Sequence, residues 1–341
     1  MGPGGRTSAP RFNEDDSEGC VLPGEGPYRV LSQVSDAERG FPAEYTLKVR
    51  RLSDPVGGCA RVPLNAYDSA PTTVSPATGC KTFHAPAAGR YDAYGVRDSR
   101  TTLAVYDGQG RTVCTTWSGC ALPAAGDYTV LTDDPTLIID RSSTDGCVPA
   151  EPGLYASAFT AAGEIDCLSL PFPTGARTAV LRPPLSGSSP WADVTAVDAD
   201  GVQRCDGSDL SAGSCELTGK APFRLLVSTD SESSPTGTYT FALHRTDIAA
   251  GCPAVPAGDF SADSPTARLS TGGGVFSHCL SIPADDHSTQ ENVQLQAAPG
   301  TTSTAQFSVL DATGKQVCSV YSSLSTWTTC ALAPGVAHTV L

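Results

Sequence analysis

The chain has 341 residues, enough for several domains, and it is rich in glycine (34) and proline (27) but poor in charged residues (17%). Its formal net charge of -14 would repel nucleic acid, and it has no apolar run of the roughly 18 residues that a membrane-spanning helix needs. We therefore expect no nucleic-acid partner and no membrane insertion, and the composition favours short strands joined by many turns.

A short segment recurs three times along the chain and predicts a β-hairpin. Each copy has an apolar run that ends in Asp, a Gly three residues later, and a second short run that ends in Cys. This pattern is typical of an antiparallel hairpin with glycine in the left-handed region. The three copies contain Asp107, Gly110 and Cys114, then Asp198, Gly201 and Cys205, then Asp311, Gly314 and Cys318.

Two further segments complete a repeating unit. One begins at Cys20, Cys120, Cys215 and Cys330, and a closing strand such as YTLKVRR or YTFALHR then leads to the first cysteine of the next unit. Units of about 90 to 105 residues suit antiparallel β-sandwiches, since solenoid repeats are usually about 20 to 50 residues long. We therefore expect an all-β row of sandwiches: the back half of a truncated repeat at 1–58, repeats at 59–146 and 147–251, and a repeat at 252–341 that stops in mid-strand.

The thirteen cysteines predict a disulfide framework and hence an oxidising compartment. Zinc is the competing interpretation, but structural zinc sites need closely spaced ligand pairs such as C-x2-C, which this sequence lacks. We join the first cysteine of each unit to the second and the third to the fourth, because these closures are local. The predicted pairs are Cys59–Cys80, Cys114–Cys120, Cys147–Cys167, Cys205–Cys215, Cys252–Cys279 and Cys318–Cys330.

Cys20 is the one cysteine that this scheme leaves unpaired. It holds the fourth position of the truncated first unit, so we expect its partner to lie upstream of Met1. The residues after Met1 contain no apolar stretch of the kind found in signal peptides, so we also expect the targeting segment to lie outside this chain.

The Asp-x-x-Gly turns could in principle bind a cation, since Asp198-Ala-Asp200-Gly201 resembles part of a calcium loop. A calcium loop needs many protein oxygens and a distal bidentate carboxylate, whereas each turn offers one or two carboxylates. An Asp at the start of a turn also bonds its own backbone. We therefore predict a structural role for these residues, no metal site and no cofactor, with calcium as the alternative that stays open.

The sequence shows no catalytic constellation. It has no G-x-S-x-G motif, and every cysteine except Cys20 has a counterpart in another unit. A glycosidase-like carboxylate pair stays open, because its separation is a three-dimensional property, but tandem copying argues against a single active site. We predict that the chain is not an enzyme. The five histidines lie at unrelated spacings, without a metal-binding pair: His84, His244, His278, His287 and His338.

Trp117 and Trp327 each lie three residues before the fourth cysteine of their unit, where the middle unit has Ala212. An exposed indole there could contact a sugar ring or a protein partner. An indole packed on the disulfide would instead close the core, as a buried Trp does in immunoglobulin domains. We favour packing in the core, because a position shared by two units is expected of a core residue, and keep ligand contact as the alternative.

The order of segments resembles tandem bacterial pre-peptidase C-terminal (PPC-like) β-sandwich domains. The resemblance rests on the Asp166-Cys167 strand, the V-x-D-x-x-G hairpin, the L-P-x-x-G-x-Y-x-V-L segment and the closing Y-T-L/F strand. It implies a jelly-roll-like or Ig-like sandwich and a non-catalytic appendage of a secreted enzyme or surface protein. Some members of that family assist attachment to substrate, and some bind calcium at an acidic N-terminal stretch.

We therefore expect a non-catalytic extracellular module of a secreted or cell-surface bacterial protein. It would act as a spacer or as an adhesion or substrate-binding array, with a polysaccharide or a protein surface as partner. The alternative is an accessory region of a secreted peptidase or other hydrolase whose catalytic domain lies outside this chain.

Overall fold

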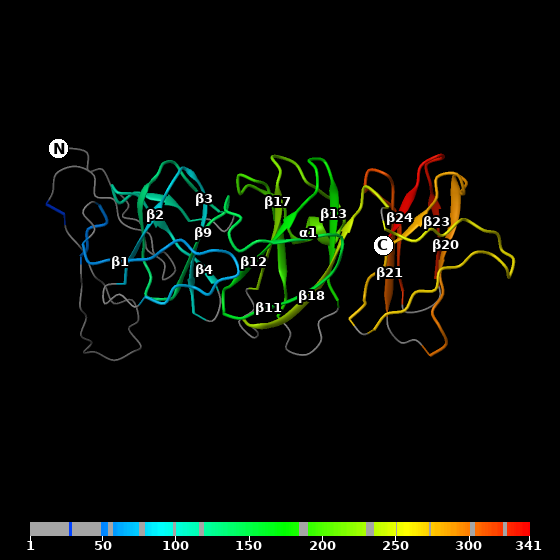
Figure 1. Cartoon of the computed structure of the whole chain (residues 1–341), viewed down its shortest axis with the longest axis horizontal. Coiled ribbons are helices and arrows are strands. Elements are labelled where there is room, and N and C mark those ends of the chain that lie inside the picture. Colours follow the sequence, from blue (N-terminus) through cyan, green and yellow to red (C-terminus); the bar gives the residue numbers. More distant parts are fainter. Residues whose placement is uncertain are drawn as a thin grey trace, which may run out of the picture.

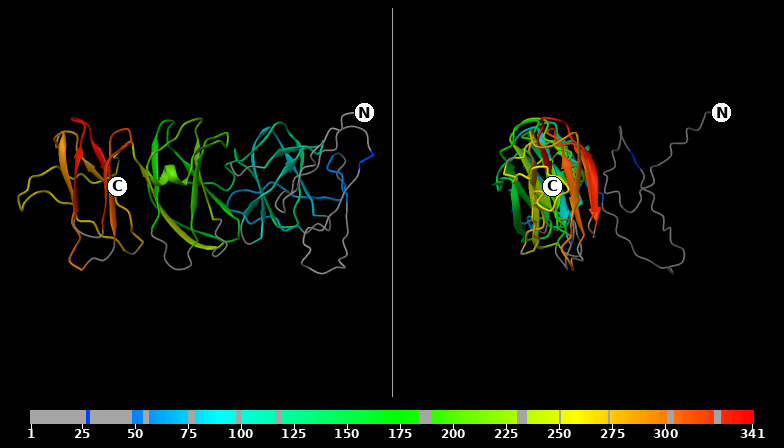
Figure 2. Two further views of the ribbon diagram at one scale, coloured as in Figure 1. Left: turned by 180° about the vertical axis from the view of Figure 1, so that it is seen from behind. Right: turned by 90° about the vertical axis from the view of Figure 1, so that its right-hand side faces the viewer.

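Three β-sheet bodies follow one another along a single axis, in the order of the chain (Figure 1). Figure 2 shows the same row from behind, and in the view along the axis the bodies overlap. The computed structural model describes residues 27–28, 49–53, 57–74, 79–97, 100–115, 119–183, 190–229, 235–249, 251–272, 274–300, 304–322 and 326–341. Within these residues the one helix is α1 (Gly207–Ser211), so the all-β prediction is confirmed.

The first body consists of two sheets that enclose a core. Phe83, Tyr91 and Ile138 are buried between the sheets, and the rings of Phe83 and Tyr91 lie 6.4 Å apart. The first sheet has the order β1 (Ala60–Arg61), β2 (Lys81–Ala85), β8 (Gly126–Val130), β5 (Val105–Tyr106) and β6 (Thr112–Cys114). In the second sheet β3 (Gly89–Val96) pairs with β4 (Arg100–Thr102), β7 (Cys120–Leu122) and β9 (Thr136–Asp140).

The second body repeats this plan with longer strands and a larger core, in which Phe159 and Tyr239 stack at 4.6 Å. Its first sheet has the order β10 (Val148–Pro149), β12 (Ile165–Leu170), β17 (Phe223–Ser228), β14 (Asp193–Val197) and β15 (Gln203–Cys205). Its second sheet has the order β11 (Gly153–Phe159), β18 (Gly237–Arg245), β13 (Arg177–Leu181) and β16 (Cys215–Glu216).

The third body has the smallest core, built around Phe307, Val309 and Leu332. One sheet has the order β19 (Leu280–Ile282), β24 (His338–Val340), β21 (Ala305–Leu310) and β22 (Gln316–Ser322). The other sheet pairs β20 (Gln290–Leu295) with β23 (Thr326–Ala331). Strands at equivalent places in the sequence thus occupy equivalent places in the sheets of all three bodies.

One parallel pairing at the sheet edge departs from the antiparallel pattern that the sequence predicted. β1 pairs in parallel with β2, β10 pairs in parallel with β12, and Ala254 forms the corresponding parallel bridge to Ser281. The chain between the two partners is long enough for the crossover that a parallel pair requires, whereas a hairpin would make the pair antiparallel. The first disulfide of each unit closes this crossover.

The cysteines pair as predicted, and Cα–Cα distances of 4.5 to 5.6 Å suit disulfides. The second bridge of each unit joins its two sheets, because the third cysteine lies on the hairpin strand and the fourth on a strand of the opposite sheet. Cys20 lies outside the described residues, as does most of the half unit predicted at 1–58. The six bridges are Cys59–Cys80, Cys114–Cys120, Cys147–Cys167, Cys205–Cys215, Cys252–Cys279 and Cys318–Cys330.

Removing the inter-sheet bridge of the second body, with Cys205→Ala and Cys215→Ala together, should destabilise that body by about 2 to 4 kcal/mol. The bridge constrains the unfolded chain and fastens the hairpin to the opposite sheet. Thermal unfolding should show a lower melting temperature than the control Gln203→Ala, whose side chain is exposed on the same strand. An unchanged melting temperature, or unreduced peptide maps that join Cys147 to Cys205, would contradict the pairing.

Candidate functional site

The Asp-x-x-Gly turn has the same internal geometry in all three bodies. Each Asp carboxylate accepts hydrogen bonds of 2.8 to 3.0 Å from the backbone N–H groups two and four residues later. The glycines have φ angles of 76°, 73° and 75°, in the left-handed region that other residues disfavour. The predicted structural role is confirmed, because Oδ1 of each Asp is hydrogen-bonded to the backbone of its own turn. The three pairs are Asp107 and Gly110, Asp198 and Gly201, and Asp311 and Gly314.

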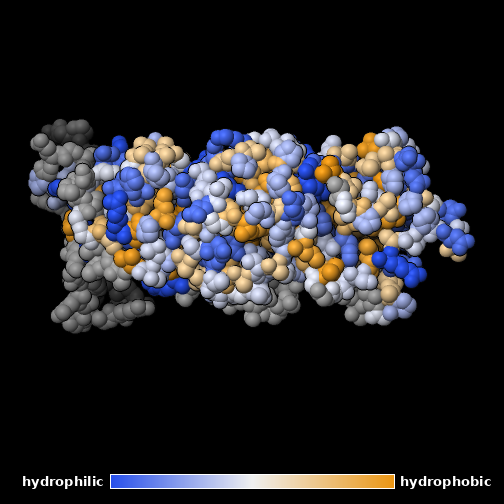
Figure 3. Space-filling view, in the orientation of Figure 1, coloured by the Kyte–Doolittle hydropathy of each residue, from blue (hydrophilic) through white to orange (hydrophobic). Residues whose placement is uncertain are grey.

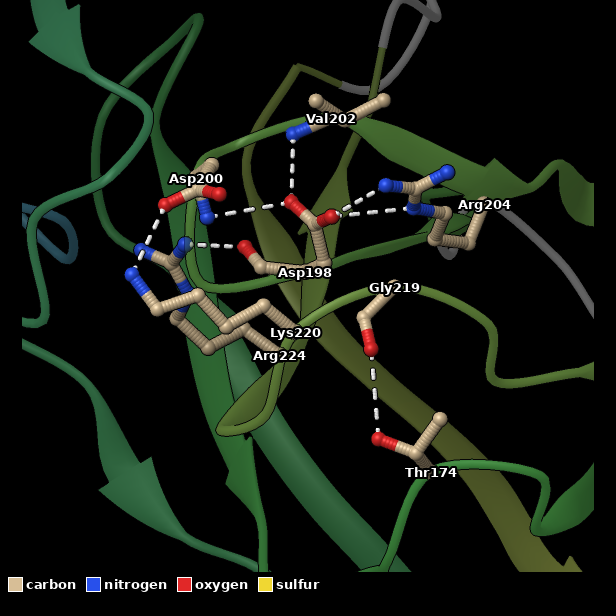
Figure 4. Close-up of polar contacts among 8 residues, drawn as sticks. All are labelled: Thr174, Asp198, Asp200, Val202, Arg204, Gly219, Lys220 and Arg224. Atoms are coloured by element: carbon tan, nitrogen blue, oxygen red, sulfur yellow. Dashed lines mark hydrogen bonds and ion pairs between the residues drawn. The ribbon is translucent and has the colours of Figure 1, made fainter.

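Figure 4 shows the turn of the second body. Its Asp198 is the most deeply buried of the three turn aspartates, with a side chain only 1% exposed. Its second carboxylate oxygen accepts a hydrogen bond of 3.0 Å from Nε of Arg204. Burial by itself raises the pKa of Asp198, but the guanidinium of Arg204 and the backbone N–H groups outweigh it and hold the pKa below its usual range. Asp198 is therefore a charged and fully bonded residue at neutral pH.

The glycine of each turn touches the end of the preceding unit. A Cβ on Gly201 would lie 2.6 Å from Cβ of Arg141. A Cβ on Gly110 would lie 3.0 Å from the carbonyl carbon of Leu52, and one on Gly314 would lie 2.7 Å from Oγ1 of Thr246. The contacted residues hold matching places in their units, six or seven positions before the next junction cysteine. The recurring turn therefore contacts the preceding unit and joins one unit to the next. The repeat pattern of the sequence did not indicate this contact.

The buried side chain of Arg224 joins the Asp198 turn to the first body. Arg224 donates a hydrogen bond of 2.6 Å to the backbone oxygen of Asp198 and another to the backbone oxygen of Ser143 (Figure 4 shows the former). Arg141, which Gly201 contacts, forms an ion pair at 3.6 Å with Asp92 inside the first body, and both side chains are buried. The junction thus holds a buried arginine that is hydrogen-bonded across it.

A hydrophobic core also crosses the junction at Cys147. Tyr67, Leu137 and Ile139 of the first body are buried against Ile165 and Val197 of the second. Strand β9 contributes to two cores, because Leu137 and Ile139 face the junction while Ile138 faces the core of its own body. The repeats in the sequence predict separate sandwiches, so the shared core differs from that prediction. The sequence does contain a sign of this shared core, the unbroken apolar run LII of β9, which is typical of a strand buried on both faces.

The prediction that Trp327 packs in the core is wrong. Its side chain is 65% exposed on β23, while Cys330 on the same strand is buried. Side chains on a strand alternate between its faces, so two residues three positions apart point to opposite sides. The separation that linked the Trp to the disulfide therefore places it on the outer face. Trp117 lies outside the described residues.

Among the histidines, the structure brings together His287 and His338, whose rings lie 5.1 Å apart. Both ring nitrogens of His287 face backbone carbonyl oxygens, of Ser288 and Val336, at 2.8 Å. These hydrogen bonds, that of Ser288 first, raise the pKa of His287 against the opposing effect of burial. The ring is thus a hydrogen-bond donor to the backbone and has no free nitrogen for a metal.

The structure also brings together three carboxylates that no sequence motif indicated, those of Asp68, Glu164 and Asp166.

In the described part of the chain no helix is both long and apolar enough to cross a bilayer. No family model matches this sequence, and no curated protein matches it at a significant level. The geometry of the junctions is therefore the basis on which we infer a function.

Replacing the glycine of the turn should loosen the junction beyond the backbone effect alone. Gly201→Ala puts a Cβ against Arg141, which should cost about 1 to 3 kcal/mol, added to about 1 to 2 kcal/mol for a left-handed alanine. Gly175→Ala is a matched control, because Gly175 has φ 86° in the same body and its Cβ would meet nothing within 4 Å. Thermal unfolding should show a larger loss for Gly201→Ala, and equal losses would contradict the docking role.

Proposed function

We propose that this chain is a non-catalytic extracellular spacer of a secreted or cell-surface bacterial protein. The observation that carries the proposal is the same docking of every turn, through Gly110, Gly201 and Gly314, on the end of the preceding unit. Six disulfides suit an oxidising compartment, and the PPC-like order of segments suits an appendage that positions another domain. A secreted hydrolase with its catalytic domain elsewhere could use the same spacer.

A spacer must keep its length, and the first junction has the interactions needed for this. Bending there would expose the core that Tyr67 shares with Ile165 and would break the bonds of buried Arg224. Exposed apolar surface and unpaired buried polar groups both cost free energy. The second junction is more polar, with Gly314 against Thr246 and a hydrogen bond of 2.9 Å between His244 and Ser277. We infer a row that is stiffest between its first two bodies.

The surface is consistent with a spacer. Figure 3 shows hydrophobic residues in small groups among hydrophilic ones, and not in one broad patch, on the face that it displays. A broad apolar patch would mark a docking surface for a large partner. The contacts that the structure does show are those between successive units of the chain.

Small-angle scattering of the whole chain tests the spacer. We expect an elongated particle with little flexibility, because the turns and the shared core restrain the junctions. Gly201→Ala should increase flexibility, while the control Gly175→Ala should leave the profile unchanged. A compact globule, or a wild-type chain as flexible as Gly201→Ala, would contradict the proposal.

A second function, adhesion, is favoured by the exposed aromatic side chains of the third body. Trp327 is 65% exposed and Tyr321 74% exposed, and large aromatic surfaces of this kind stack on sugar rings and anchor protein partners. The same array would then combine reach with weak attachment to a polysaccharide. The spacer does not depend on this attachment.

Trp327→Ala should abolish binding of the chain to insoluble polysaccharide or cell wall, yet shift the melting temperature by no more than about 2 °C, because an exposed side chain adds little to stability. Phe260→Ala is the control, since Phe260 is 97% exposed in the same unit but lies outside its strands. Co-sedimentation measures the binding. Retained binding by Trp327→Ala, or equal loss in both variants, would count against adhesion through this residue.

A further inference from the structure

Three carboxylates meet at the junction of the first two bodies. Asp68 comes from the first body, and Glu164 and Asp166 come from the second, and one oxygen of each lies within 4.8 Å of the others. Glu164 is fully buried and Asp166 is 6% exposed, while Asp68 is open to water. This cluster is unusual, because burying like charges together is unfavourable unless a cation or a proton accompanies them.

Each buried carboxylate has one oxygen that is held and one that is bare. Oε2 of Glu164 accepts hydrogen bonds from the backbone N–H groups of Thr160 and Ala161 at 2.6 and 2.8 Å, and from Oγ1 of Thr160 at 2.9 Å. Oδ2 of Asp166 accepts one from the hydroxyl of Tyr239 at 2.5 Å. Oε1 of Glu164 and Oδ1 of Asp166 are buried and have no partner. The protein thus orients both side chains and leaves an oxygen of each without a donor.

No arginine or lysine within the described residues forms an ion pair with these three carboxylates. The cluster therefore lacks a positive charge that the protein itself could supply.

Contacts across the junction position both Asp68 and the loop of Glu164. Asp68 has φ 57°, in the left-handed region, and its N–H donates a hydrogen bond of 2.9 Å to the oxygen of Ile165. On the other side, the loop that carries Glu164 is pressed onto the first body, since a Cβ on Gly163 would lie 2.6 Å from Val96. Both halves of the cluster are thus fixed by contacts across the junction.

We propose that Asp68, Glu164 and Asp166 bind a divalent cation, with calcium as the best fit. Carboxylate oxygens are the ligands that calcium prefers, and calcium accepts six to eight oxygens in irregular arrangements. The bare oxygens of Glu164 and Asp166 supply buried ligands, and water can complete the shell on the exposed side at Asp68. The bonds from Thr160 and Tyr239 then serve to orient the ligands, as outer partners do in metal sites.

A cation at this place would fasten the first body to the second, because its ligands come from both. It would act beside the turn of Asp198 and the core of Tyr67, which belong to the same junction. The site does not depend on the spacer proposal, since its oxygens and their burial stand whatever the array does.

Titration of the chelator-treated full chain with CaCl2 tests the site, at about pH 8 so that calcium does not compete with protons. We expect calcium to bind and to raise the melting temperature, and terbium to give luminescence sensitised by the nearby Tyr239. Asp68→Asn should weaken binding at least tenfold, and because Asp68 is exposed this variant should fold normally. Glu164→Gln should weaken binding further.

Asp285→Asn is the matched control, an exposed carboxylate in the third body, and it should bind calcium as the wild type does. Calcium binding that is equally strong in Asp68→Asn and in the wild type would overturn the proposal. So would a wild-type chain that calcium neither binds nor stabilises, which would mean that a shared proton holds the carboxylates together. Magnesium that binds as tightly as calcium would overturn the choice of metal.

Discussion

The close approach of the glycine at the tip of each Asp-x-x-Gly turn to the preceding unit is the constraint on which the arrangement of the units depends. The carboxylate bonds to the turn from inside, so the outer surface at Gly201 is bare and a neighbouring strand end can reach it. The bridge of Cys205 to Cys215 fastens the same hairpin to the opposite sheet. Turn, disulfide and docking surface thus form one rigid part, and it recurs in every unit.

The features that could be predicted from the sequence are those formed by residues a few positions apart and repeated in each unit. The hairpins follow from an Asp and a Gly three residues apart, and the disulfides follow from short closures such as Cys114 to Cys120. Repetition helped, because three copies of a spacing carry more information than one. Even so, local spacing misled for Trp327, since the separation from Cys330 was considered without the alternation of a strand.

What joins the units could not be predicted in the same way, because its parts are far apart in the sequence. Arg224 reaches Ser143 across the junction, and Asp68 meets Glu164 from another body, and neither contact has a motif. Asp166 was taken as part of a strand pattern, although its buried and unpaired oxygen matters more. Interactions of this kind depend on how whole sheets are placed, which spacing along the chain does not specify.

Each unit offers a turn at one end and a receiving surface at the other, as Gly201 and Arg141 do between the first two bodies. Such a contact is heterologous, so it cannot be satisfied by pairing two identical faces about a two-fold axis. The row consequently has a direction, and because its bodies follow one another along a single axis it does not close into a ring (Figure 1). Its reach would change in fixed steps as copies of the unit are gained by duplication or lost by deletion, with the same kind of junction between neighbours.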